Sequence, residues 1–345
     1  MPKSYSFLPF NFMRIDGEVL VVNPGGDYLF LSEEDFRAFA KGEMLKGHPQ
    51  YLSLKAKHFL YDTTPDFAVS LLATQYRTKK SFLRGFTGLH MMVITLRCNQ
   101  KCKYCQVSSE HADADKFDMS IDTARKCVDL AFKSPSPYIK IEFQGGEPLL
   151  NYETMKFVVG YAKERNLSHK KDLEFVVCTN LIFVTDEQLS FFKNEGVYIS
   201  TSLDGPHEIH DSNRISEDRD GTYARVIESM ERAQRVVGRE NVSALMTATK
   251  TSLGRFPEVV DEYISRGFNS IFFRSINPYG MADKYKQSLG YSVEEFLKSY
   301  RDGLEYIIEL NLQGQFIVEE YARIVLRRIL TPFTTGFVDL RGEKR

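Results

Sequence analysis

The 345-residue sequence lacks the features that would mark a membrane, secreted or nucleic-acid-binding protein. Its formal net charge is −1, so composition gives no reason to expect nucleic acid or an anionic membrane as a partner. No apolar run approaches the roughly 20 residues of a membrane span. The N-terminus, MPKSYSFLPF, has neither the basic start nor the apolar core of a secretory signal. These absences favour a cytoplasmic, enzyme-like protein with no nucleic acid and no membrane as partner.

Cysteine is scarce and unevenly placed. The chain has 5 cysteines, and Cys98, Cys102 and Cys105 lie together in the segment CNQKCKYCQ. Disulfide frameworks belong mainly to small secreted domains, so this distribution in a long chain does not predict one. Three clustered thiols instead predict a metal site.

The first part of the chain, residues 1–85, predicts a small β/α module. Asp16-Gly17 separates two apolar segments, 12–15 and 18–22, and is the two-residue signal of a β-hairpin. A strand at 28–31 and a helix opened by Ser32 and Asp35 should follow. Two more helices are expected, at 49–61 and 65–80.

From about residue 88 the chain alternates between apolar strands and amphipathic helices. This pattern predicts a parallel sheet covered by helices, either open or barrel-like. The expected strands are 90–97, 138–144, 173–180, 197–203, 242–249 and 270–276, and the helices are 121–133, 152–165, one opened by Thr185 and Gln188, 222–237, 256–266 and a long one from Ser292.

Chemistry-bearing residues follow the ends of these strands. Parallel α/β proteins place function at the carboxyl ends of their strands, so these residues should meet at one edge of the sheet. They are the cysteines, the Gly-Gly-Glu-Pro turn at 145–148, Thr179-Asn180, the Leu-Asp-Gly-Pro turn at 203–206 and Asn277.

The spacing Cys-x₃-Cys-x₂-Cys leaves two kinds of metal site open. Structural zinc takes four ligands, and His111, six residues after Cys105, could complete a Cys₃His set. Iron–sulfur clusters are normally held by four thiolates, and three would leave one iron open for a substrate or cofactor. Spacing alone favours iron–sulfur over zinc without deciding between them.

Two motifs in combination resemble the radical S-adenosylmethionine (SAM) superfamily. They are Cys98-x₃-Cys102-x-Tyr104-Cys105 after the first strand and Gly145-Gly146-Glu147-Pro148 after the second. The resemblance covers roughly residues 88–310. It implies an α/β fold with a partial (β/α)₆ barrel, over residues 86–315, beside the small N-terminal β/α module. It also implies a [4Fe-4S] cluster on the three cysteines, with SAM chelating the fourth iron.

The same resemblance suggests which residues contact SAM. Gly145 and Gly146, without side chains, would let the backbone approach its methionine part. Glu147, followed by Pro148, would face its amino group. Arg214 would pair with its carboxylate, a task that suits a guanidinium.

Two further contacts are less sharply predicted. Ser202 would bring a hydroxyl to the ribose or carboxylate of SAM, and Ser200 competes for that role. Tyr104 would lie near the adenine or serve in packing. His207 and His210 are expected as plain loop residues rather than acid/base groups, and Asp204 is a candidate general base but first of all a turn residue. Cys127 and Cys178 are expected to be buried as small apolar side chains.

Longer segments resemble a narrower group, the His-Xaa-Ser system radical SAM maturases. These are relatives of peptide-modifying and anaerobic sulfatase-maturing enzymes. The segments include FLPFNFMRIDGE, SPSPYIKIEFQGGEPLLN, VSALMTATKTSLGR and ILTPFTTGFVDLR. This resemblance implies a peptide or protein precursor as substrate and an external one-electron donor of the flavodoxin or ferredoxin type. Residues 1–85 would either recognise a leader peptide or simply cap the barrel.

The expected activity is reductive cleavage of SAM to a 5′-deoxyadenosyl radical that abstracts hydrogen from the substrate. Two alternatives stay open. One is a catalytically silent peptide-binding scaffold with zinc or a vestigial cluster. The other is a radical SAM enzyme that acts on a sulfatase or a small molecule.

The sequence departs from the family pattern at two places. Leu181 follows Thr179-Asn180 where many relatives have glycine, which puts a close backbone approach in doubt. Residues 316–345 are expected to form a C-terminal helix and tail that stop before the extension in which many peptide maturases carry auxiliary clusters. No cysteine follows Cys178, so ligand count leaves no second cluster in this sequence.

Overall fold

The computed structural model describes residues 5–107, 109, 113–216 and 221–331. The chain divides into two compact units, one of residues 1–84 with 326–345 and one of residues 85–325. Among the described residues, no helix is long and apolar enough to cross a membrane.

The N-terminal unit contains a three-stranded antiparallel sheet, in the order β2 (Asn11–Ile15), β3 (Glu18–Val22) and β4 (Tyr28–Ser32). The predicted hairpin is confirmed: Asp16 and Gly17 both have positive φ angles, 49° and 86°, as a type I′ turn requires. Helix α1 (Glu33–Lys41) begins where the Ser32 side chain accepts a hydrogen bond from the Asp35 backbone N–H.

The rest of this unit packs around buried side chains of the sheet and of α1, including Val21, Leu31 and Phe39. The predicted helix at 49–61 is wrong in its second half. Helix α2 (Pro49–Ala56) ends early because His58 takes a positive φ of 56°, and the chain then forms β5 (Leu60–Tyr61), which pairs with β1 (Ser6–Phe7). The predicted helix at 65–80 is confirmed as α3 (Pro65–Lys79), which is followed by the short η1 (Ser81–Gly85).

The larger unit contains a six-stranded parallel sheet, in the order β12-β10-β9-β8-β7-β6. The strands lie side by side in chain order, as in the successive units of a partial radical SAM barrel. The predicted fold class is therefore confirmed. The strands are β6 (Leu89–Thr95), β7 (Tyr138–Gly145), β8 (Asp172–Cys178), β9 (Val197–Ser202), β10 (Val242–Thr247) and β12 (Phe273–Arg274).

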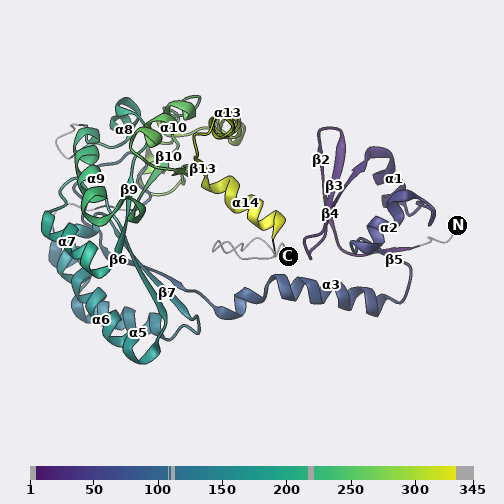
Figure 1. Ribbon diagram of the computed structural model, residues 1–345, viewed down its shortest axis with the longest axis horizontal. Helices are drawn as coiled ribbons and strands as arrows, with labels where there is room; N and C mark the ends of the chain where they lie inside the picture. The colour runs from purple at the N-terminus through teal and green to yellow at the C-terminus, as the bar shows by residue number, and fades with distance from the viewer. Residues whose placement is uncertain (1–4, 108, 110–112, 217–220, 332–345) are drawn as a thin grey trace. The chain divides into compact units, whose positions relative to one another are not determined.

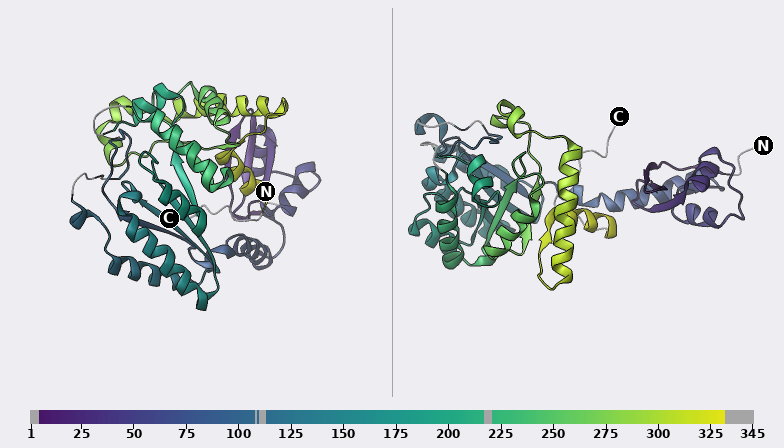
Figure 2. Two further views of the ribbon diagram at one scale, coloured as in Figure 1. Left: turned by 60° about the vertical axis from the view of Figure 1, so that its left-hand side comes forward. Right: turned by 90° about the horizontal axis from the view of Figure 1, so that it is seen from above.

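Helices gather on the outer side of this sheet, as Figures 1 and 2 show from three directions. The capping boxes predicted at Thr185 and Ser292 are both formed. The connecting helices are α5 (Ile121–Phe132), α6 (Tyr152–His169), α7 (Asp186–Glu195), α9 (Tyr223–Val237), α10 (Phe256–Ser265) and α13 (Val293–Leu312), with shorter elements α4 (Ala114–Phe117), η2 (Pro148–Asn151), α8 (His207–Asn213), η3 (Arg239–Asn241), α11 (Met281–Lys284) and α12 (Lys286–Leu289).

Helices cover one face of the sheet, which agrees with the barrel-like form of the predicted helix-covered sheet. Along β7, Ile139, Ile141 and Phe143 are fully buried in the core shared with the helices. The alternate residues Lys140, Glu142 and Gln144 are half-buried and line a cavity on the other face. Because side chains of a strand alternate between faces, the sheet has an apolar outer face and a polar inner face.

The last predicted strand, 270–276, is divided in two. β11 (Ser270–Ile271) pairs with β13 (Val318–Glu319), while β12 pairs with β10 in the large sheet. The apolar segment 270–276 therefore contributes one strand to each of two sheets. Of the predicted C-terminal helix and tail, α14 (Glu320–Leu330) is present, and residues 332–345 lie outside the described part of the chain.

Candidate active site at the end of the parallel sheet

A cavity of about 600 Å³ lies over the inner face of the sheet and the carboxyl ends of its strands. Its size is typical of a site for a small molecule or cofactor. Most of the residues predicted for the site line it: Cys98, Cys102, Tyr104, Cys105, Gly145, Gly146, Thr179, Asn180, Ser200, Ser202, Arg214 and Asn277.

The cysteine loop is held by backbone pairing with a segment more than 100 residues later in the chain. The N–H groups of Lys101 and Lys103 donate to the carbonyls of Ile215 and Asn213, at 2.9 and 3.0 Å. A tight turn within the loop is closed by the Cys105 N–H, which donates to the Cys102 carbonyl at 3.2 Å. The loop conformation is thus set by the protein backbone as well as by any bound metal.

The three cysteines remain candidate ligands for a cluster or for a single metal ion. All three are half-buried on the cavity wall, and none forms a disulfide. Among the described residues, no group of three or more His, Cys, Asp and Glu side chains is arranged to hold one metal ion. A [4Fe-4S] cluster does not need such convergence, because each thiolate binds a different iron. His111, the fourth ligand of the zinc alternative, lies outside the described residues.

Burial keeps two of these thiols protonated while no metal is bound. It raises the pKa of Cys98 to about 12 and that of Cys102 to about 11. Metal binding requires the thiolate, so cluster assembly at these cysteines must release protons.

Gly145 and Gly146 are required by the chain itself. The Gly146 N–H donates to the Thr95 carbonyl at 3.0 Å, and the Glu147 N–H donates to the Arg97 carbonyl at 2.7 Å. A Cβ atom at either glycine would lie 2.2 Å from one of these carbonyl oxygens. The predicted reason for the glycines was a close approach to SAM. The reason visible here is a close approach to the segment that leads into Cys98.

Glu147 is buried, with an exposed fraction of 3%, and its carboxylate joins the ends of two strands. Oε1 accepts from the Thr179 hydroxyl at 2.7 Å and from the Leu149 N–H at 3.0 Å, while Oε2 accepts from the Asn180 N–H at 2.8 Å. Burial raises the pKa of this carboxyl group, and these donors act against that shift. The predicted contact with the SAM amino group has these internal donors as competitors. Pro148, also buried, begins η2 directly after it.

Leu181 takes the conformation that glycine would take at this position. Its φ is +60°, and its side chain is fully buried in the core. A left-handed backbone costs a residue with a Cβ about 1–2 kcal/mol. Full burial of a leucine contributes about 1.5–3 kcal/mol, which offsets that cost. Leucine in place of the glycine of Thr-Asn-Gly therefore keeps the left-handed backbone conformation. Asn180 Nδ2 donates to Asn99 Oδ1 in the cysteine loop at 2.7 Å.

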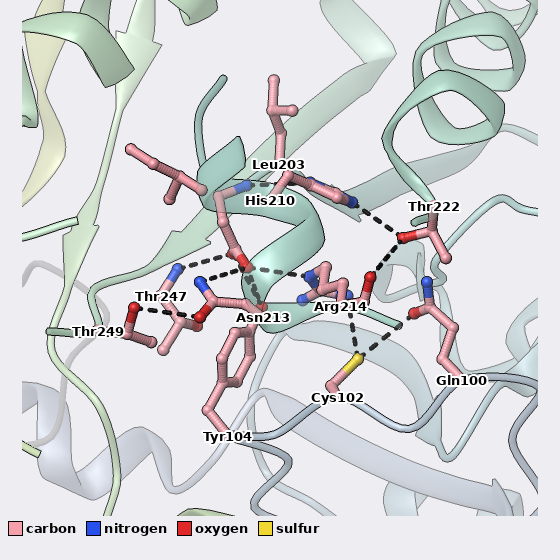
Figure 3. Close-up of polar contacts among 12 residues, drawn as sticks. Gln100, Cys102, Tyr104, Leu203, His210, Asn213, Arg214, Thr222, Thr247 and Thr249 are labelled. Atoms are coloured by element: carbon pink, nitrogen blue, oxygen red, sulfur yellow. Dashed lines mark hydrogen bonds and ion pairs between the residues drawn. The ribbon is translucent and has the colours of Figure 1, made fainter. Parts of the chain in front are cut away.

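Arg214 lies at the centre of a buried polar network beside the cysteine loop (Figure 3). Nη1 contacts Cys102 Sγ at 3.8 Å, and Nε lies 3.4 Å from Asp204 Oδ2. Nε has no well-formed hydrogen bond within the described protein. A buried guanidinium on a cavity wall can also bind an anionic ligand group such as the SAM carboxylate.

Asp204, predicted as a turn residue, is fully buried and accepts four contacts. Besides Arg214, these come from the Tyr104 hydroxyl at 2.7 and 2.8 Å, the Thr247 N–H at 3.2 Å and the Asn213 side-chain amide at 3.3 Å. Burial raises the pKa of Asp204, and the Arg214 guanidinium acts against that shift. Tyr104 thus has a packing and anchoring role in the protein, with its ring 5.2 Å from the Arg214 guanidinium carbon.

His207 and His210 lie on helix α8, although a loop was expected. His210 is fully buried, and burial lowers its pKa to about 3, so its ring is neutral. Its Nδ1 accepts from the Asp204 N–H at 3.4 Å, which leaves Nε2 to donate to the Thr222 hydroxyl at 3.2 Å. Thr222 in turn donates to the Arg214 carbonyl at 3.1 Å. His210 therefore supports the network and is not placed as an acid or base.

The polar inner wall of the sheet was missed by the sequence reasoning. Lys140 pairs with Glu174 at 2.5 Å across β7 and β8. Glu142 accepts a hydrogen bond from Gln144 and another, at 3.4 Å, from the thiol of Cys178. Cys178 therefore faces the cavity, while Cys127 packs against the core as predicted. The alternation in YIKIEFQ, with Lys, Glu and Gln on one face, was the signal that could have identified this wall.

Comparison with known proteins agrees with this description. The family model "Radical SAM superfamily" matches residues 92–262. An uncharacterized protein of Methanothermobacter thermautotrophicus is 33% identical over 184 residues, which cover 53% of this chain and 66% of that relative. This chain therefore spans slightly less than two thirds of that relative.

Solved structures share the fold at low sequence identity. The structure "Native anSMEcpe with bound AdoMet and Cp18Cys peptide" has a TM-score of 0.61 at 21% identity, over 72% of this chain and 66% of the other. Streptococcus suis SuiB bound to precursor peptide SuiA has a TM-score of 0.50 at 14% identity, over 89% and 71%. The chain is thus similar to the radical SAM superfamily over residues 92–262, and its sheet and the cysteine loop at the end of the first strand agree with that similarity.

Proposed function

We propose that this chain is a radical SAM enzyme that modifies a peptide or protein substrate, of the type of the His-Xaa-Ser system maturases. A [4Fe-4S] cluster and SAM are the cofactors that the superfamily implies. The cluster would be held by Cys98, Cys102 and Cys105. The observation that carries the proposal is the presence of these three cysteines and the buried Arg214 on the wall of one cavity.

The chain's own residues would bind and orient the two cofactors. When bound and reduced by an external donor, they supply a 5′-deoxyadenosyl radical that abstracts hydrogen from the substrate. Arg214 would hold the SAM carboxylate, and Gly145 and Gly146 would bring backbone groups close to its methionine part. Ser202 or Ser200 would offer a hydroxyl to the ribose or carboxylate of SAM. Both serines line the cavity, and their positions do not favour one over the other. Glu147 would accept a hydrogen bond from the amino group through Oε2, which accepts one internal hydrogen bond while Oε1 accepts two.

The activity can be tested with the chain as it is. Reconstituted without oxygen, the protein is expected to bind about four irons and four sulfides, to be brown, and to form 5′-deoxyadenosine from SAM and dithionite. Mass spectrometry of a co-expressed peptide rich in His-Xaa-Ser repeats is expected to show a mass change. One zinc per chain and no visible absorption would instead identify a scaffold. SAM cleavage with no change in the peptide would redirect the search to a sulfatase or a small molecule.

The N-terminal unit offers an edge strand for peptide recognition. All five residues of β2 are exposed, Met13 to 62%, and β2 pairs on one side only among the described strands. A peptide can add as a further strand to such an edge through its backbone hydrogen bonds. We therefore assign leader recognition to residues 1–85 as part of the proposal.

Hydrogen exchange of the full chain tests this assignment. Addition of the same His-Xaa-Ser-rich peptide is expected to slow amide exchange in residues 11–15, because outward N–H groups of β2 gain partners. Exchange in β4, the opposite edge of the sheet, serves as the internal control. Equal exchange with and without a peptide that the enzyme does modify would show that the unit only caps the barrel.

A further inference from the structure

We propose that Arg214, positioned by Asp204, raises the reduction potential of the cluster by acting on its ligand Cys102. The inference rests on the proposed cluster at Cys98, Cys102 and Cys105. It assigns Arg214 a second role that is compatible with the first, because a guanidinium has five N–H donors and can serve a sulfur and a carboxylate at once.

The geometry joins a cation directly to one of the three sulfurs. Arg214 Nη1 lies 3.8 Å from Cys102 Sγ, the long distance of a hydrogen bond to sulfur, and only 9% of the residue is exposed. Cys102 Sγ also contacts a neutral group, Gln100 Oε1 at 3.5 Å. In Figure 3 dashed lines join the sulfur of Cys102 to both of these side chains. Cys105 differs, since its thiol contacts the Val107 carbonyl at 3.3 Å.

Charge explains the direction of the effect. Reduction adds one negative charge to a cluster, and hydrogen bonds to the sulfurs and nearby charge set its potential. A buried cation beside a ligand sulfur stabilises the reduced state, more strongly than it would in water because the surroundings are less polar. Arg214 should therefore make the cluster easier to reduce.

Asp204 acts on the cluster only through Arg214 and is a positioning residue. Its carboxylate lies 3.4 Å from Arg214 Nε, on the guanidinium atom that does not contact the sulfur. The carboxylate is itself immobilised by Tyr104, Asn213 and the Thr247 backbone. Its negative charge partly cancels the cation, so Asp204 should lower the potential while it fixes the guanidinium in place.

Substitutions of Arg214 and Asp204 are therefore expected to shift the midpoint potential of the cluster in opposite directions. Arg214→Met keeps a long side chain but removes the charge and the N–H donor, and is expected to shift the midpoint potential to more negative values. Asp204→Asn removes the opposing charge and is expected to shift the potential to less negative values. Arg255→Met, which removes an arginine paired with Glu258 and Glu208 outside the cavity, is the matched control and should leave the potential unchanged.

The measurement is a redox titration followed by electron paramagnetic resonance, on reconstituted protein without SAM and at matched iron content. Opposite shifts support the inference, because a merely structural role would reduce cluster content without setting the sign of the potential. Shifts in the same direction, or none, overturn it. A wild-type protein that assembles no cluster overturns the proposed function, whereas an intact cluster with an unmoved potential overturns only this inference.

A milder variant covers the case in which Asp204→Asn does not fold or bind iron. Tyr104→Phe removes the hydroxyl that donates to both Asp204 oxygens and that favours the charged form of this buried carboxylate, so Asp204 should oppose the Arg214 charge less. A shift in the same direction as that of Asp204→Asn, but smaller, supports the inference. No shift, or a shift of the opposite sign, overturns it.

Discussion

Replacement of Cys102 by alanine is expected to abolish the iron–sulfur absorption of the reconstituted protein and to reduce 5′-deoxyadenosine formation to background. Cys102 lies on the cavity wall in a loop with two other cysteines, and its removal leaves two thiolates for a cluster that normally takes four ligands. Iron and sulfide analysis, visible spectroscopy and chromatography of the SAM products measure the effect. Cys98→Ala and Cys105→Ala should behave in the same way.

A matched control for this experiment is Cys127→Ala. Cys127 lies on α5, packs against the core and is not part of the cavity wall. This variant should keep its iron and its activity and lose no more than about 1 kcal/mol of stability. Retention of a normal iron content and spectrum by Cys102→Ala would show that the cluster is not held as proposed.

Gly146→Ala is expected to destabilise the protein by about 3 kcal/mol or more, at the upper end of overpacking effects. The added Cβ would lie 2.2 Å from the Arg97 carbonyl oxygen and 2.8 Å from that of Leu96. Both obstacles are backbone atoms. The next residue, Glu147, donates its N–H to the same Arg97 carbonyl, so the segment with Gly146 and the segment with Arg97 cannot move apart independently. Denaturant unfolding of the metal-free protein measures the loss. Cluster content should fall as well, because Arg97 directly precedes Cys98.

Gly160→Ala provides the comparison within the same unit. Gly160 lies inside α6, and a Cβ there would meet no atom within 4 Å. Because alanine loses less backbone entropy than glycine in a helix, this variant should gain about 0.5–1 kcal/mol. Equal stability of Gly146→Ala and wild type would mean that the junction of β6 and β7 is looser than the structure shows.

Local signals were enough to predict most of the elements. Periodicity placed the six strand–helix units, and short polar motifs such as the Asp16-Gly17 turn and the Ser292 capping box placed turns and helix starts. These predictions succeed because turn and cap preferences are properties of a few neighbouring residues. They failed at 270–276, where one apolar run pairs with two different sheets. Pairing partners distant in sequence decide such a division.

In the candidate site, too, features set by neighbouring residues could be predicted from the sequence, and contacts between distant residues could not. The cysteine motif and the Gly-Gly-Glu-Pro turn could be identified directly, because the spacing of metal ligands and the preferences of turn residues depend on residues that are close in the sequence. The partners of Asp204 could not: Tyr104 is 100 residues away and Thr247 is 43 residues away in the sequence. The alternation of Lys140, Glu142 and Gln144 was visible, but only the fold shows that their face of the sheet borders a cavity.

The sequence by itself therefore carried the resemblance to the radical SAM superfamily, the three clustered thiols and the succession of strands and helices. Tertiary structure alone decided that Glu147 joins two strand ends, that glycine is needed at 145 and 146 for the chain's own carbonyls, and that Arg214 meets Cys102. The physical reason is that local conformation depends on neighbours in the chain. Burial, charge pairing and close backbone approach depend on which distant segments the parallel sheet brings side by side.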